Sequence, residues 1–151
     1  PRERAMSIYL TITRAEYDDF PMVWFEGEFG SGCAEWRGDD FAEVGQEYIC
    51  EIDTVGDMVW GESAFPSEKA ADLILMDEDG SVIVNGRLDP FVRNEDGSVY
   101  CFDEEQKGLV GDVRIGAGLI AFNVYDIPLD RECTYIWFRT PGLSLWPIRY
   151  I

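Results

Sequence analysis

Short segments with β-strand character, separated by glycine-containing or acidic turns, run through the whole chain and constrain its fold more than any single motif. Segments such as MSIYLTI at 6–12 are rich in β-branched and aromatic residues, and turn residues recur at intervals of about 8 to 12. No stretch of about a dozen residues carries the apolar repeat of a helix. The pattern predicts an all-β fold, a single-domain antiparallel β-barrel or β-sandwich built from hairpins.

One to three short helical turns are expected between these strands. Thr13 followed by Glu16 resembles a capping box and predicts a helical turn that ends at Pro21. Residues 38–46 are expected to form a second helical turn or a loop, and residues 67–71 are the third candidate. The length of 151 residues suits one domain, which we assign to residues 6–151. The segment PRERA at 1–5 is expected to be an upstream extension or an expression remnant, because Met6 looks like a natural start.

The phrase Glu-Asp-Gly-Ser-Val occurs twice, at 78–82 and at 95–99. Calcium loops of the EF-hand type need an oxygen ligand at their first position, where these two alignments place Leu75 and Val92. Calcium is therefore disfavoured. Asp-Gly between alternating apolar residues predicts two hairpins with two-residue type I′ turns, whose tips would gather acidic residues at one end of the sheet.

The net charge limits the kinds of partner that the chain is expected to bind. Thirty acidic and 12 basic residues give a formal net charge of −18, which repels nucleic-acid phosphates and anionic lipid and attracts basic proteins. The alternative is that the charge serves solubility alone. Apolar runs are too short to cross a bilayer, and no signal-peptide segment opens the chain. We therefore expect a cytoplasmic protein that binds neither nucleic acid nor membrane.

Chemistry-bearing residues show no catalytic or metal-binding signature. The four cysteines form no Cys-x-x-Cys pair and histidine is absent, which disfavours zinc; Cys50 and Cys101 are predicted to be buried, although disulfides in a secreted protein stay open. Paired carboxylates such as Glu51 and Asp53 are unremarkable among 30 acids. We predict no enzyme activity and no cofactor.

The tryptophans fall into two groups, predicted core residues and candidates for the surface. Trp24 and Trp137 lie in apolar strand centres and are predicted to be core residues, whereas Trp36 and Trp60, each near a glycine, are the better surface candidates. Exposed aromatic residues would serve a sugar-binding platform or a protein interface.

Two stretches, ITRAEYDDFPMVWFEGEF at 12–29 and ADLILMDEDGSVIVNGRLDPF at 71–91, carry a resemblance to a known class. A strand, a short turn ending in Phe-Pro, a tryptophan-bearing strand with Glu-Gly, and a meander with Asp-Gly hairpins on a very acidic chain resemble immunity proteins of bacterial polymorphic-toxin and contact-dependent inhibition systems. The resemblance implies a cytoplasmic inhibitor that binds one cognate toxin domain with a basic active-site cleft. It transfers no site residues, because these proteins are diverse.

Candidate contact residues come from the acidic loops, with one aromatic anchor. They are Trp36, Asp39, Asp40, Glu43, Asp77, Glu78, Glu95, Asp96, Asp103, Glu104 and Glu105. Two alternatives remain: a carbohydrate- or small-ligand-binding β module, and a phosphate mimic that inhibits a nucleic-acid-binding protein.

Overall fold

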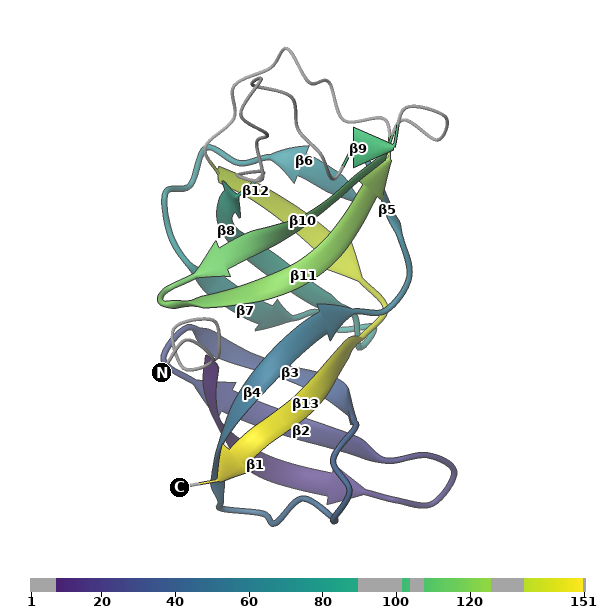
Figure 1. Ribbon diagram of the computed structural model, residues 1–151, viewed down its shortest axis with the longest axis vertical. Helices are drawn as coiled ribbons and strands as arrows, with labels where there is room; N and C mark the ends of the chain where they lie inside the picture. Colours follow the sequence, from purple (N-terminus) through teal and green to yellow (C-terminus); the bar gives the residue numbers. More distant parts are fainter. Residues whose placement is uncertain (1–7, 90–101, 104–107, 126–134, 151) are drawn as a thin grey trace.

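The computed structural model describes residues 8–89, 102–103, 108–125 and 135–150, and in this part of the chain every regular element is a strand (Figure 1). The first seven strands are β1 (Ile8–Glu16), β2 (Met22–Gly27), β3 (Gly30–Trp36), β4 (Glu47–Thr54), β5 (Met58–Val59), β6 (Ala64–Pro66) and β7 (Leu73–Met76). The other six are β8 (Val82–Asp89), β9 (Phe102–Asp103), β10 (Gly108–Ile115), β11 (Gly118–Tyr125), β12 (Tyr135–Thr140) and β13 (Leu143–Tyr150). All belong to one sheet.

The sheet closes into a barrel, which decides between the two predicted architectures. Strand pairings complete a ring of eight in the order β1-β2-β3-β7-β8-β10-β11-β4. β13 then pairs with β3 in parallel and with β4 in antiparallel orientation, which closes a smaller ring of β1, β2, β3, β13 and β4 in the lower half of Figure 1. β5–β8 and β10–β12 build the upper half.

Alternation of apolar residues explains how these strands bury a core. In β1, Ile8, Leu10 and Ile12 are buried and the residues between them face outward, which is the period of two that a strand requires. The same alternation places Ile136 and Phe138 of β12 in the core at 0% exposure. The all-β prediction is therefore confirmed.

Several local predictions fail in instructive ways. Thr13 lies inside β1, and residues 67–71 form a connection without helix, so the helical turns predicted there are wrong. Residues 38–46 form a loop, which is the second of the two alternatives predicted for them. Gly56 and Asp57 are residues typical of hairpin turns, but they join no hairpin, because β4 and β5 both pair in parallel with β11 instead of with each other.

The hairpin at the first Glu-Asp-Gly-Ser-Val copy is confirmed, with Met76 opposite Val82. Its connection spans residues 77–81 rather than two residues, and the Asp77 N–H donates to the Ser81 carbonyl over 2.8 Å. Gly80 has φ +89°, a conformation that glycine adopts readily. The second copy lies outside the described residues.

Of the four tryptophan predictions, the one for Trp36 is wrong, while Trp24, predicted to be a core residue, packs against the core from a half-buried position. Trp36 is buried, at 4% exposure, whereas Trp24 and Trp137 are half-buried on the outward face of their strands. Trp24 lies under the Arg14 guanidinium, 4.4 Å from the ring centre, and Trp137 stacks on Phe65 at 4.5 Å. Trp60 is also half-buried. The predicted burial of Cys50 is confirmed, at 0% exposure, and burial raises the pKa of its thiol to about 12.

Candidate protein-binding site

The connection between β3 and β4, residues 37–46, lies at the lower end of the molecule (Figure 1). It forms an acidic rim around a hollow of about 490 Å³. Trp36 and Tyr48 are buried and form the floor with Pro147, and their rings meet edge to face at 4.9 Å. The exposed rim comprises Asp39, Asp40, Phe41, Glu43 and Ile148. Four predicted contact residues, Trp36, Asp39, Asp40 and Glu43, are thus brought together.

Hydrogen bonds fix this connection to the barrel along its whole length. The Trp36 indole N–H donates to the Asp40 carbonyl over 2.8 Å, and the Glu43 N–H donates to the Tyr48 hydroxyl over 2.9 Å. Backbone bonds join Arg37 N–H to Leu145 of β13 at 2.9 Å and Gly45 N–H to Ile12 of β1 at 2.7 Å. The acidic rim is therefore held in place before any partner arrives.

Glycines occur where this local structure needs them. A Cβ at Gly38 would lie 2.7 Å from the Trp36 indole nitrogen and 2.9 Å from Pro147, so only glycine lets the chain pass this close. Gly45 has φ +89°, which turns the connection back into β4.

Tyr17, which follows β1, supports the same connection from the side. Its ring stacks on Phe41 at 4.3 Å, and its hydroxyl both accepts from the Ala42 N–H and donates to the Ala42 carbonyl. Desolvation raises the pKa of Tyr17, opposed by the hydrogen bond to Ala42 and reinforced by Tyr48.

The three rim carboxylates have no cationic partner within the described part of the chain. Ion pairs there join Arg14 to Glu16, Arg37 to Glu35, and Arg139 to Asp77 and Asp79. Neither Asp39, Asp40 nor Glu43 takes part in one. Their negative charge is therefore available to an external cation.

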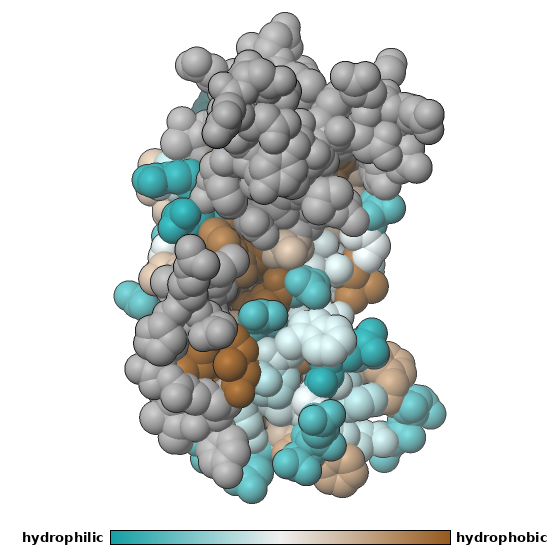
Figure 2. Space-filling model, in the orientation of Figure 1, coloured by the Kyte–Doolittle hydropathy of each residue, from teal (hydrophilic) through white to brown (hydrophobic). Residues whose placement is uncertain are grey.

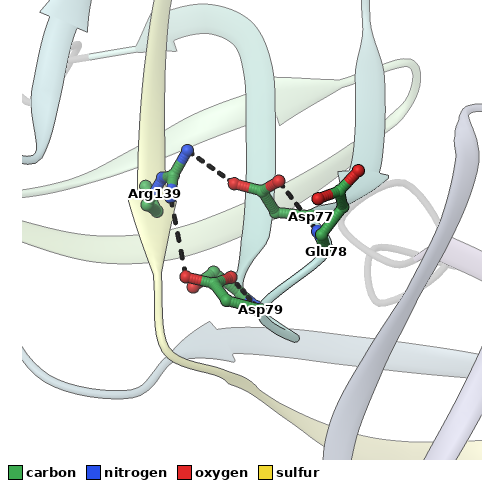
Figure 3. Close-up of polar contacts among 5 residues, drawn as sticks. Asp77, Glu78, Asp79 and Arg139 are labelled. Carbon is green, nitrogen blue, oxygen red and sulfur yellow. Dashed lines mark hydrogen bonds and ion pairs between the residues drawn. The ribbon is translucent and has the colours of Figure 1, made fainter.

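Asp77 and Asp79, in contrast, are engaged within the molecule (Figure 3). Asp77 lies 2.6 Å from Arg139 of β12 and accepts from the Glu78 N–H at 2.8 Å, while Asp79 accepts from the Ser81 N–H at 2.9 Å. Hydrogen bonds from Ser81, and secondarily Arg139, lower the pKa of Asp79. The side chain of Glu78, the other predicted contact residue of this hairpin, is exposed and takes no part in these ion pairs.

Of the remaining predicted contact residues, Asp77 and Glu78 lie in the 77–81 connection and do not line the hollow. Asp103 lies in β9, which pairs with β10 in the upper half. Glu95, Asp96, Glu104 and Glu105 lie outside the described residues. In the part of the chain that the structure describes, no three Cys, Asp or Glu side chains converge as a metal site, and no helix is long and apolar enough to span a membrane.

Sequence reasoning missed Asp18, Asp19 and Phe20. The triplet Asp-Asp-Phe occurs at 18–20 and again at 39–41, and all six residues are exposed. The repeat can be read from the sequence, but the capping-box pattern of Thr13 and Glu16 predicts that the first copy lies in a short helical turn.

Comparisons with known proteins give no information on the function. No protein-family model matches the chain, and neither a curated protein nor a solved structure matches it.

Proposed function

We propose that this protein is an immunity protein, which acts in the cytoplasm by binding a cognate bacterial toxin domain and blocking its basic active-site cleft. The observation that carries the proposal is the set of three exposed carboxylates, Asp39, Asp40 and Glu43, without ion-pair partners in the described part of the chain, on a fixed connection around an aromatic-floored hollow. The net charge of −18 points to the same kind of partner.

The chemistry suits an inhibitor of an enzyme that acts on a phosphate-bearing substrate. Arg and Lys in such a cleft bind carboxylates through charge-assisted hydrogen bonds, as they bind phosphate. A fixed connection loses little conformational entropy on binding, and the negative field of the chain accelerates encounter with a basic surface. Fast and tight binding is what neutralising a lethal enzyme requires.

A second function is favoured by the size and floor of the same hollow. About 490 Å³ with Trp36 and Tyr48 beneath it lies within the range of small-ligand pockets. A carbohydrate or other small ligand would then bind without any basic protein. A glycan array and a thermal-shift screen against small ligands distinguish this function, since only this function predicts a hit in the absence of any basic protein.

The test of the immunity function is protection of cells. The protein is co-expressed with the toxin domain encoded by the neighbouring gene, and survival and the association rate of the purified pair are measured. We expect protection by the wild type, and an association rate at low salt about tenfold lower for the Asp39→Lys/Asp40→Lys variant.

A matched control changes the same amount of charge elsewhere. Glu51 and Asp53 are exposed on β4, so Glu51→Lys/Asp53→Lys alters net charge equally and should slow association much less. Absence of protection by the wild type contradicts the immunity function. Equal slowing by both double variants contradicts the assignment of the site.

A further inference from the structure

The two Asp-Asp-Phe triplets lie on neighbouring connections at the same end of the five-strand ring. Residues 18–20 belong to the β1–β2 connection and residues 39–41 to the β3–β4 connection. Phe20 is 54% and Phe41 75% exposed, so each pair of carboxylates is followed by a phenylalanine ring in contact with solvent.

Direct contacts fix these two connections to each other. The Tyr17 ring stacks on Phe41 at 4.3 Å and its hydroxyl binds the Ala42 backbone. On the other side of the first triplet, the Pro21 carbonyl accepts from the Trp36 N–H at 3.0 Å. Each triplet is therefore bracketed by contacts that join its connection to the other one.

Apolar side chains extend this surface between the acids. Val44 is 62% exposed and Ile148 40% exposed, and Ile148 borders the same hollow as Phe41. Exposed aromatic and aliphatic side chains that are rimmed by polar residues mark protein contact surfaces, where aromatic anchors supply much of the affinity. On the face drawn in Figure 2, hydrophobic residues lie interspersed among hydrophilic ones over the lower half.

We propose that the two triplets form a single docking surface, whose occupant is a basic protein surface with apolar side chains that pack on both phenylalanine rings. Charge complementarity names the occupant, because Asp18, Asp19, Asp39 and Asp40 have no ion-pair partner among the described residues. Arg or Lys side chains flanking an apolar centre satisfy both parts of the surface. The proposal rests on the proposed function only in taking the partner to be a basic protein.

The test uses a defined probe rather than the toxin. A synthetic peptide of alternating Arg and Leu is titrated into the ¹⁵N-labelled protein at low salt, and amide chemical shifts are followed. We expect the amides of both connections, 17–20 and 38–46, to shift together along one binding curve. A peptide with Gln in place of Arg should bind at least tenfold more weakly.

Variants separate the rings from the charge. Phe20→Ser and Phe41→Ser should each weaken the Arg-Leu peptide several-fold, whereas Leu75→Ser, at an equally apolar residue that is 49% exposed on β7, should leave it unchanged. Both rings are largely exposed, so we expect both variants to fold, and thermal unfolding verifies this.

Three results would overturn the docking surface: shifts confined to one connection, equal binding of the Gln peptide, or equal weakening by Leu75→Ser. Failure of the proposed immunity function is observed in a separate experiment, as death of cells that express the wild-type protein together with the toxin domain. A wild type that protects cells while both phenylalanine variants bind the peptide normally refutes this surface alone.

Discussion

The connections at 37–46 and 77–81 are both acidic and both turn at a glycine with φ +89°, Gly45 and Gly80, yet they expose their charge differently. Asp77 and Asp79 face Arg139 and hold backbone N–H groups of their own turn. In the described structure Asp39 and Asp40 face no cation, and their connection is held by Trp36, Tyr17 and Tyr48 instead. A turn held by its own carboxylates has little charge left for a partner, whereas a turn held by aromatic side chains keeps its carboxylates free.

The largest expected effect comes from removing the aromatic support of the 37–46 connection. Trp36→Ala deletes a side chain that is 4% exposed together with its hydrogen bond to Asp40, and should lower the free energy of unfolding by about 3–5 kcal/mol. Urea denaturation measures this. Trp146→Ala, at a residue that is 45% exposed, is the control and should cost well under half as much; equal costs would mean that Trp36 has no special part in the connection.

Tyr17→Phe should have the next largest effect, because it removes both hydrogen bonds to Ala42 while keeping the ring stack. We expect a loss of about 1–2 kcal/mol. Faster amide hydrogen exchange should be confined to residues 38–46. Exchange that also accelerates at 77–81 would contradict the independence of the two connections.

The raised pKa of Tyr17 adds a pH dependence to the same comparison. The folded protein holds the phenolic proton more tightly than the unfolded chain, so stability is fully present below the ordinary value of 10.0 and falls as pH rises through the higher folded value. Urea denaturation between about pH 9 and 11 should show a steeper decline for the wild type than for Tyr17→Phe. Parallel declines would exclude this proton.

Gly45→Ala and Gly80→Ala form a matched pair. Both glycines have φ +89° and neither has an atom within 4 Å of a Cβ built on it, so the cost of each substitution is backbone strain alone, about 1–2 kcal/mol. Equal shifts in stability are expected, with reduced association to the basic partner only for Gly45→Ala. Weakened association by Gly80→Ala would place the 77–81 hairpin in the contact surface.

The smallest expected effect concerns Arg139. Arg139→Gln should raise the pKa of Asp79 only part of the way to its ordinary value of 3.8, since the hydrogen bonds from Ser81 are the larger cause of its lowering. An NMR titration of the side-chain carboxyl measures this. The stability that Asp79 contributes is present above its unfolded pKa and is lost as pH falls through the folded one. Full return to 3.8 would assign the lowering to Arg139 instead.

The all-β class could be predicted because strand alternation is local, as Ile8, Leu10 and Ile12 illustrate. Closure of the barrel could not, because β4 pairs with β11 across residues 55–117, which separate these two strands. The capping-box spelling of Thr13 and Glu16 predicted a helical turn, and pairing of β1 with β2 overrode it. Tertiary context commonly outweighs such local preferences.

The candidate site was predictable in part for a similar reason. The acidity and glycines of 37–46 marked an exposed connection, and Asp39, Asp40 and Glu43 are indeed exposed. Burial of Trp36 depends on Tyr48 and Pro147, which lie elsewhere in the sequence. The ion pair of Asp77 and Arg139 likewise joins the β7–β8 hairpin to β12. Because these segments are far apart in the sequence, no local pattern predicts the ion pair.

The position of β13 after the other strands also determines when the acidic rim of the 37–46 connection can form during synthesis. Arg37 is anchored to Leu145, and Pro147 and Ile148 complete the hollow, so the ribosome must deliver residues beyond 148 before the acidic rim has its final support. Bringing such distant segments together slows folding. A nascent chain that has made both Asp-Asp-Phe triplets therefore still lacks the finished surface until β13 has paired with β3 and β4.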